Sequence, residues 1–456
     1  MAYQTINPFN NETVKTFPTL TDDEIKNLVN QADACYKQWR KTDFATRRKV
    51  MKKAASILRD KKAEFARLVT LEMGKLIAEA EGEVDLTADI FDYYADNAEQ
   101  FLAPEKLTPS DGRKAYVEHD SVGIILCVEP WNFPYYQLVR VAATNLMTGN
   151  VVMVKHASIV PQCAAAFEKL LLDAGAPKGA YTNLYASTDQ VSKLITDRRI
   201  RGVAVTGSEK AGSVVAGKAG ESLKKSTMEL GGSDAFIVLE DADLDKAVQW
   251  GLWGRMNNTG QCCVAAKRFI VVEAIADKFL ERLKECFSKL TMGDPMDRST
   301  TLGPLSSESA AKDLAAQTAE AIKHGAKAVI GGKRPDRPGA FMEATILTNI
   351  TKDNPVFYKE FFGPVAMFFR VPDEKAAIEL ANDSEFGLGG SVFSQDIERA
   401  KRVASQIDTG MVFINRPTWT TPDLPFGGVK HSGYGRELAK DGILEFANRK
   451  LIYIEN

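Results

Sequence analysis

The chain has 456 residues, which is long enough for two or three domains with sizeable cores. Its 58 Lys and Arg residues and 60 Asp and Glu residues nearly cancel, so we expect no nucleic-acid partner, which would demand a basic surface. Only four histidines are present, which removes most Cys/His zinc patterns and most histidine-based acid–base arrangements. We therefore expect no metal, and a small molecule or a protein as partner.

The N-terminal residues contain neither the charged nor the apolar region of a secretion signal. The longest apolar run, at 122–128, is too short to cross a bilayer. We expect a protein that works in the cytoplasm without membrane contact, with its six cysteines reduced.

The first hundred residues have helical patterns. Thr21 and Glu24 form a capping-box signal before apolar residues at helical spacing, and two more helices are predicted at roughly 46–71 and 77–102. From residue 122 onward, short apolar strands alternate with helices. Strands are predicted at 122–128, 151–154, 181–185, 202–205 and 235–239, and a second series begins near Phe269 and continues at 328–330, 365–369, 391–393 and 411–414. This alternation predicts two α/β domains with mainly parallel sheets.

A cysteine pair, Cys262 and Cys263, follows a polar stretch and is the first candidate for catalysis. A thiol in such a loop can be accessible and partly ionised, although cysteines are more often buried packing residues. No histidine lies within a hundred residues upstream, so a carboxylate is the candidate base. Glu229 lies among Met, Leu and Gly residues, where we expect its pKa to be raised as a general base requires, although a helix cap would also explain it.

Asn132 lies between Pro130 and Pro134, directly after a predicted strand. A rigid amide at the carboxyl end of a strand can stabilise a developing oxyanion, whereas the simpler interpretation is a turn in which Asn bonds its own backbone. The segment 206–208, Thr-Gly-Ser, precedes a helix and suits a pyrophosphate, and Lys155 can reach ribose hydroxyls.

Taken together, the motifs of this chain resemble the NAD(P)-dependent aldehyde dehydrogenase superfamily, from the N-terminal helices to the last strand. The motifs that carry the resemblance are Pro130-Trp131-Asn132-Phe133-Pro134, Lys155, Thr206-Gly207-Ser208, Glu229-Leu230-Gly231-Gly232, Gly260-Gln261-Cys262-Cys263, Glu360-Phe361-Phe362-Gly363-Pro364, and Pro425 to Lys430 followed by Ser432-Gly433 and Gly435-Arg436-Glu437.

The resemblance implies a role for each matching residue. Cys263 would be the nucleophile and Cys262 a packing neighbour; Asn132 and the Cys263 backbone NH would hold the oxyanion, and Glu229 would activate the water that hydrolyses a thioester. The implied nucleotide-binding residues are Trp131, Lys155, Ser158, Thr206, Gly207, Ser208, Glu360 at the ribose and Phe362 near the nicotinamide.

Arg140 lies eight residues after Asn132, roughly 80° around one predicted helix, so it can face the same pocket. In the succinate-semialdehyde branch of the family, an Arg at this place binds the substrate carboxylate, and the resemblance implies the same for Arg140, with Thr420. An ion pair with a nearby carboxylate is the other interpretation of Arg140. That branch often has a second Arg where this chain has Asn257, so a broader aldehyde specificity is the alternative.

NAD-preferring relatives often have a Glu three residues after the lysine, where this chain has Ser158. A neutral hydroxyl removes the repulsion of a 2′-phosphate, so NADP is the expected cofactor, with NAD possible.

By the same resemblance, residues 1–102 and 121–231 form a Rossmann-type cofactor domain, 232–432 an α/β catalytic domain, and 103–120 with 433–456 a small β element for oligomerisation. We expect a homodimer or homotetramer, because exposed strand edges need covering. Two other functions stay open: ester hydrolysis without a nucleotide, and a structural protein without catalysis.

Overall fold

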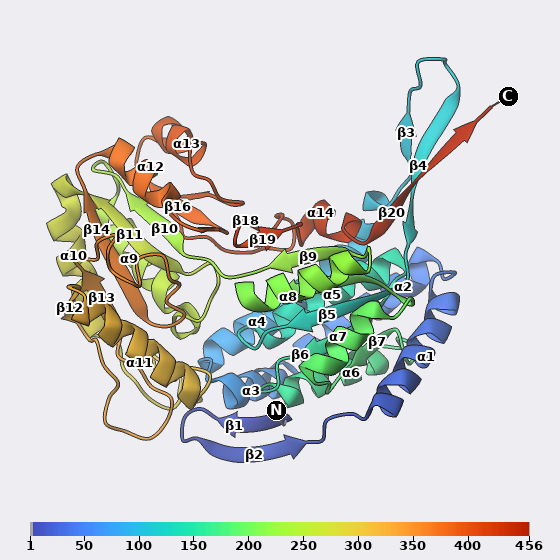
Figure 1. Cartoon of the computed structure of the whole chain (residues 1–456), viewed down its shortest axis with the longest axis horizontal. Helices are drawn as coiled ribbons and strands as arrows, with labels where there is room; N and C mark the ends of the chain where they lie inside the picture. The colour runs from blue at the N-terminus through green and yellow to red at the C-terminus, as the bar shows by residue number, and fades with distance from the viewer. Residues whose placement is uncertain (1–2, 456) are drawn as a thin grey trace.

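The computed structural model describes residues 3–455 as two lobes and a projecting arm (Figure 1). The chain begins with an antiparallel hairpin of β1 (Tyr3–Asn7) and β2 (Glu12–Phe17), which the sequence did not predict. Asn11 at its turn has a φ of 62°, a conformation that asparagine tolerates better than most residues.

The helical prediction for the first hundred residues is confirmed, with one break. Helix α1 (Asp22–Trp39) begins at the Thr21 and Glu24 capping box. The single helix predicted over 46–71 is two helices, α2 (Phe44–Asp60) and α3 (Lys62–Met73), because Lys61 has non-helical backbone angles. Helix α4 (Ile77–Phe101) follows.

The first lobe is built on a six-stranded sheet with the order β19-β9-β8-β5-β6-β7. Its bounds are β5 (Ile124–Glu129), β6 (Val151–His156), β7 (Tyr181–Asn183), β8 (Ile200–Thr206), β9 (Lys225–Glu229) and β19 (Gly433–Tyr434). All neighbours pair in parallel except β19 with β9. The helices between these strands are α5 (Pro134–Thr148), α6 (Pro161–Asp173), α7 (Thr188–Thr196) and α8 (Glu209–Glu221).

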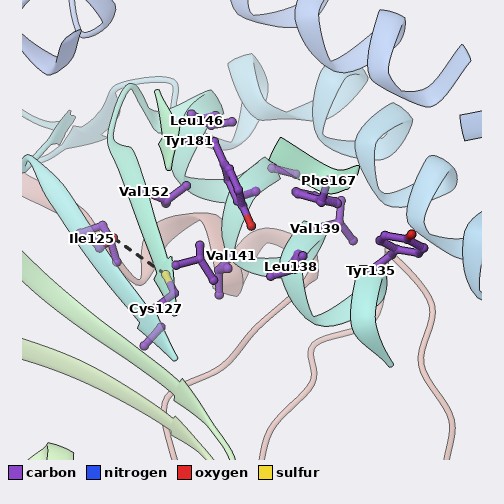
Figure 2. Close-up of a cluster of buried hydrophobic side chains, with 14 of the residues drawn as sticks. Ile125, Cys127, Tyr135, Leu138, Val139, Val141, Leu146, Val152, Phe167 and Tyr181 are labelled. Atoms are coloured by element: carbon purple, nitrogen blue, oxygen red, sulfur yellow. Dashed lines mark hydrogen bonds between the residues drawn. The ribbon is translucent and has the colours of Figure 1, made fainter. Parts of the chain in front are cut away.

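Helix α5 is buried along its whole length. Figure 2 shows why: Leu138, Val139 and Val141 of α5 lie in one apolar cluster with β5 and β6 residues and with Phe167 of α6. This burial holds α5 rigidly against the sheet, so the residues at its N-terminus have a fixed position.

The second lobe is a seven-stranded sheet with the order β12-β13-β14-β11-β10-β16-β17. Its strands are β10 (Asp234–Val238), β11 (Ala266–Val272), β12 (Lys327–Ile330), β13 (Thr345–Thr348), β14 (Val365–Val371), β16 (Gly390–Phe393) and β17 (Phe413–Ile414), and only β12 is antiparallel to its neighbour. Its helices are α9 (Leu244–Met256), α10 (Glu273–Ser288), α11 (Glu308–Lys323), α12 (Glu374–Asn382) and α13 (Ile397–Ala404). The predicted α/β fold class with two sheets is confirmed.

The arm consists of β3 (Glu105–Leu107), β4 (Lys114–Ser121) and β20 (Ala447–Ile454) in one antiparallel sheet (Figure 1). The stretch 433–444 lies apart from the arm: β19 pairs with β9, and the Tyr94 hydroxyl donates to the Ala439 carbonyl in α14 (Ala439–Leu444). This stretch therefore belongs structurally to the first lobe. Gly433 and Gly435 lie directly against Met228 and Thr227 of β9, where a larger residue would not fit.

Within residues 3–455, no helix has the length and apolar character needed to cross a membrane. The same residues contain no group of three or more His, Cys, Asp or Glu side chains arranged to hold a metal.

Candidate active site

A cavity of about 410 Å³ lies at the carboxyl ends of β5 and β8 and opens toward the second lobe. It brings together eight residues that the sequence predicted for the site: Trp131, Asn132, Thr206, Gly207, Ser208, Cys263, Glu360 and Phe362. The remaining lining residues are Pro130, Gln137, Leu230 and Gly231. Segments more than two hundred residues apart in the chain therefore converge on one space.

Cys263 lines this cavity and is half-buried, whereas Cys262 is 5% exposed and does not line it. The loop before the pair contains a short 3₁₀ turn (Asn257–Gly260) in which Asn258 and Thr259 have left-handed backbone angles, with φ of 54° each. Such strain needs support, and the Asn258 side chain supplies it by donating to the Asn132 carbonyl at 2.8 Å and the Gln261 carbonyl at 3.2 Å. The accessible thiol is thus the one that the family resemblance indicated.

Lys267 fixes the loop from the other side. Its buried ammonium donates to the carbonyl oxygens of Cys262 and Cys263, both at 2.8 Å, and lies 2.9 Å from Glu360 Oε1. A hydrogen bond with Cys262 and then burial raise the pKa of the Cys263 thiol, whereas the charges of Lys267 and Arg140 lower it. The net effect raises the pKa of Cys263 well above its ordinary value, so the two cations oppose this rise only in part and the group is a thiol before substrate and nucleotide bind.

Asn132 is 4% exposed and does not bond its own turn through its side chain. Its Nδ2 donates to the Gln261 carbonyl at 3.1 Å, so its amide points to the cysteine loop. Its Oδ1 accepts from Gln137 Nε2 at 3.3 Å. The interpretation as a plain turn residue is therefore wrong, and the amide is directed at the loop that carries the nucleophile.

Glu229 ends β9 and is 2% exposed. Both carboxylate oxygens are buried without a hydrogen-bond partner among the described residues. A Cβ at position 427 would lie 2.7 Å from Glu229 Oε1, so glycine there allows the C-terminal motif to cover the carboxylate. Burial and the neighbouring Glu437 raise the pKa of Glu229 well above its ordinary value, as the sequence predicted for a general base.

Two further carboxyl groups lie near Glu229 and were not singled out from the sequence. Glu129 ends β5 and Glu437 follows the C-terminal glycine motif. Burial raises the pKa of both, and the guanidinium of Arg140 opposes that rise. Glu129 and Glu437 are far apart in the sequence, and only the folded chain brings both of them close to the buried guanidinium of Arg140.

Arg140 does not line the cavity, and its side chain is 1% exposed. Its Nε lies 2.8 Å from Glu437 Oε2, and its Nη2 donates to Gln137 Oε1 and to Thr206 Oγ1. Of the two interpretations of Arg140, the structure contains the ion pair. The Nη1 arm makes only a 3.4 Å contact with the Tyr136 hydroxyl.

Thr420 also lies outside the cavity lining and is 7% exposed. It accepts a hydrogen bond of 2.8 Å from the Tyr136 hydroxyl, which in turn accepts from Arg140. The two residues predicted to bind substrate are therefore connected through Tyr136, behind the wall of the cavity.

The nucleotide residues fall into two places. Around the cavity, Glu360 Oε1 accepts from the Gly232 NH at 3.2 Å, and the rings of Phe362 and Trp131 meet edge to face at 5.7 Å. Ser208 is the N-cap of α8, so backbone NH groups face the space beside it, as an anionic pyrophosphate requires.

Lys155 and Ser158 line a second cavity of about 270 Å³ with Ser187, Thr188 and Asp189. The Lys155 ammonium lies 5.7 Å from the centroid of the Tyr3 ring. Burial lowers its pKa. A cation beside several hydroxyl groups fits a phosphorylated ribose.

Two residues of the site were missed by sequence reasoning. These are Lys267 and Gln137. No sequence pattern marks the role of either residue, because their hydrogen-bond partners are brought close only by the fold. Gln137 lies three residues before Arg140 in the same helix, and this spacing is the sequence clue that both side chains face the same side.

Comparison with known proteins agrees with this geometry. The model of the aldehyde dehydrogenase family matches residues 1–452. The chain is 51% identical to succinate-semialdehyde dehydrogenase [NADP(+)] of Deinococcus radiodurans, over 99% of this chain and 94% of that one. It is 44% identical to a probable enzyme of the same name from Synechocystis, over the full length of both. A crystal structure of succinic semialdehyde dehydrogenase from Streptococcus pyogenes in complex with NADP+ matches with a TM-score of 0.98 at 50% identity, covering all of both chains. The chain belongs to the aldehyde dehydrogenase family.

Proposed function

We propose that this protein oxidises succinate semialdehyde to succinate with NADP+. The observation that carries the proposal is the cavity in which the accessible Cys263 thiol, the Asn132 amide and six of the proposed nucleotide residues meet, with Glu229 buried beside it. The names of the most similar relatives support the substrate and the cofactor.

In the first half-reaction the Cys263 thiolate adds to the aldehyde carbon, and a new C–S bond forms while the carbonyl oxygen becomes an oxyanion. Asn132 Nδ2 and the Cys263 NH hold that oxyanion, and the surrounding apolar walls strengthen these hydrogen bonds. The bound nucleotide supplies the hydride acceptor. The residues proposed to hold it are Trp131, Lys155, Ser158, Thr206, Gly207, Ser208, Glu360 and Phe362.

In the second half-reaction water must attack the thioester on Cys263. Glu229 accepts the proton of this water, the C–S bond breaks, and the thiolate of Cys263 leaves with the carboxylic acid as product. The raised pKa of Glu229 makes it a stronger base than an exposed carboxylate.

NADP preference is proposed from Ser158 and Lys155, because a hydroxyl and a cation accommodate a 2′-phosphate that a glutamate at position 158 would repel. The Asp189 carboxylate also lines this cavity, but it is exposed, so solvent screens its repulsion. Ser158→Glu should lower the NADP-to-NAD ratio of kcat/KM at least about tenfold, chiefly through a higher KM for NADP. Steady-state kinetics with both nucleotides on both proteins checks this. A wild-type protein that strongly favours NAD would defeat the assignment.

For the substrate carboxylate we propose the Nη1 arm of Arg140 and the Thr420 hydroxyl, since the other arms of Arg140 are already engaged. Binding there requires the hydrogen bond between Tyr136 and Thr420 to open, because the Arg140 side chain is 1% exposed. Specificity would then follow from the cost of leaving the guanidinium arm unpaired when a neutral aldehyde enters.

A panel of succinate semialdehyde, glutarate semialdehyde and butanal tests this substrate assignment. We expect wild type to prefer succinate semialdehyde over butanal in kcat/KM by at least about a hundredfold, and Arg140→Ala to lose most of that preference. The ratio is the informative quantity, because any general loss of catalysis affects both aldehydes equally. Equal efficiency on butanal would change the assignment to a broader aldehyde dehydrogenase.

We further propose that the domain division predicted from the sequence describes the working units, except that 433–444 packs on the first lobe and the arm of β3, β4 and β20 is the oligomerisation element. The exposed Leu451, Tyr453 and Ile454 on β20 support this, because an antiparallel edge with apolar side chains favours pairing with another copy. A homodimer or homotetramer is expected. The six free cysteines support a reducing, cytoplasmic setting.

A further inference from the structure

Four buried groups form a one-way line of hydrogen bonds that ends at the catalytic loop. Arg140 Nη2 donates to Gln137 Oε1, Gln137 Nε2 donates to Asn132 Oδ1 at 3.3 Å, and Asn132 Nδ2 donates to the Gln261 carbonyl at 3.1 Å. Arg140, Gln137 and Asn132 are all at most 4% exposed, so bulk water has little access to these bonds.

The direction of this line is fixed by chemistry. A guanidinium has five donors and no acceptor, so the group that faces Arg140 must be the oxygen of the Gln137 amide. The NH2 of Gln137 then faces Asn132, so the Asn132 side chain must accept this hydrogen bond through Oδ1. The NH2 of Asn132 is therefore the end that remains for the cysteine loop and for the substrate oxygen.

Three further contacts fix the orientation of the Arg140 side chain. Its Nε lies 2.8 Å from Glu437, its Nη2 also donates to Thr206 Oγ1 at 3.1 Å, and its guanidinium lies 4.7 Å from the centroid of the Tyr136 ring. Burial alone would lower the pKa of Arg140, but Glu437 and the other nearby acidic groups outweigh burial and raise it, so the donor end stays charged at every working pH.

We propose that Gln137 is a positioning residue that transmits the orientation of Arg140 to Asn132 and so keeps an NH2, rather than an oxygen, at the oxyanion position. Without this constraint, an amide that turned over would offer an acceptor to a developing negative charge. The inference rests on the proposed function, because Asn132 acts there as the oxyanion donor.

Gln137→Met keeps the volume of the side chain and removes both hydrogen bonds. We expect kcat for aldehyde oxidation to fall at least about tenfold, with the affinity for NADP+ unchanged. Cys263 should still react with iodoacetamide at the wild-type rate, since alkylation forms no oxyanion. Leu138→Met, one residue along the same buried helix, is the matched control and should leave kcat within about twofold of wild type.

The double variant Asn132→Ala/Gln137→Met separates positioning from a general structural role. If Gln137 acts through Asn132, the double variant should be no slower than Asn132→Ala alone. Losses that multiply, or full activity of Gln137→Met, would overturn the inference. Should Gln137→Met fold poorly, Gln137→Glu keeps an acceptor for Arg140 but offers no donor when ionised, and the same non-additivity is expected. An Asn132→Ala protein as active as wild type would instead contradict the proposed function.

Discussion

Replacing Cys263 by alanine should abolish aldehyde-dependent reduction of NADP+, a loss of at least about a thousandfold in kcat. Cys263 carries the only thiol among the residues that line the cavity, and the hydroxyl groups of Thr206 and Ser208 are far weaker nucleophiles at neutral pH. NADP+ binding should survive within about twofold, because the proposed nucleotide contacts lie on other residues. Initial rates and fluorescence titration of the nucleotide measure both quantities.

Cys262→Ala is the matched control for this prediction. Cys262 is 5% exposed and does not line the cavity, so its loss removes only packing and the hydrogen bond with the neighbouring thiol. We expect its kcat to stay within about tenfold of wild type. An inactive Cys262→Ala protein beside an active Cys263→Ala protein would show that the wrong cysteine was chosen.

Replacing Glu229 by glutamine should block the second half-reaction and leave the first. We expect a rapid burst of reduced nucleotide, up to one per active site, followed by turnover that is about a hundredfold to ten-thousandfold slower. Stopped-flow absorbance and mass spectrometry of the quenched protein detect the burst and the thioester on Cys263. Glu221→Gln, a change at an exposed carboxylate in α8, is the matched control.

The pH dependence follows from the same group. Burial and Glu437 raise the pKa of Glu229, so at low pH the carboxyl is protonated and cannot accept a proton from water. Thioester hydrolysis should therefore increase as the pH rises through this elevated pKa, and Glu229→Gln should lose that increase. A variant with no burst, or with the wild-type pH profile, would contradict the role of Glu229.

The parts of the molecule that the sequence predicted are those with a local signal. Most strands of both sheets appear as short apolar runs, whereas β9, β13 and β19 were not predicted. Asn132 follows the end of β5, Thr206 ends β8 and Glu229 ends β9. Parallel strands place their carboxyl ends on one edge, so residues at these ends meet in space. The Cys263 loop does not end a strand of the first lobe's sheet, and it was identified by its motif Gly260-Gln261-Cys262-Cys263.

The parts that the sequence did not predict depend on long-range contacts. The sequence left open an ion pair for Arg140 but did not identify its partner, because Glu437 is almost three hundred residues away in the chain. Lys267 lies inside β11, where its burial against Glu360 and two carbonyls is a consequence of the fold. The β1–β2 hairpin was missed because its strands are short and β2 is almost wholly exposed.

The most direct test of the account is a product balance. The purified protein is incubated with succinate semialdehyde and NADP+, and reduced nucleotide and succinate are both measured. We predict that the two products appear in equal amounts, that neither forms when NADP+ is left out, and that Cys263→Ala forms neither. Succinate formation from an ester without nucleotide reduction, or no reduction with any aldehyde of the panel, would contradict the proposed oxidation.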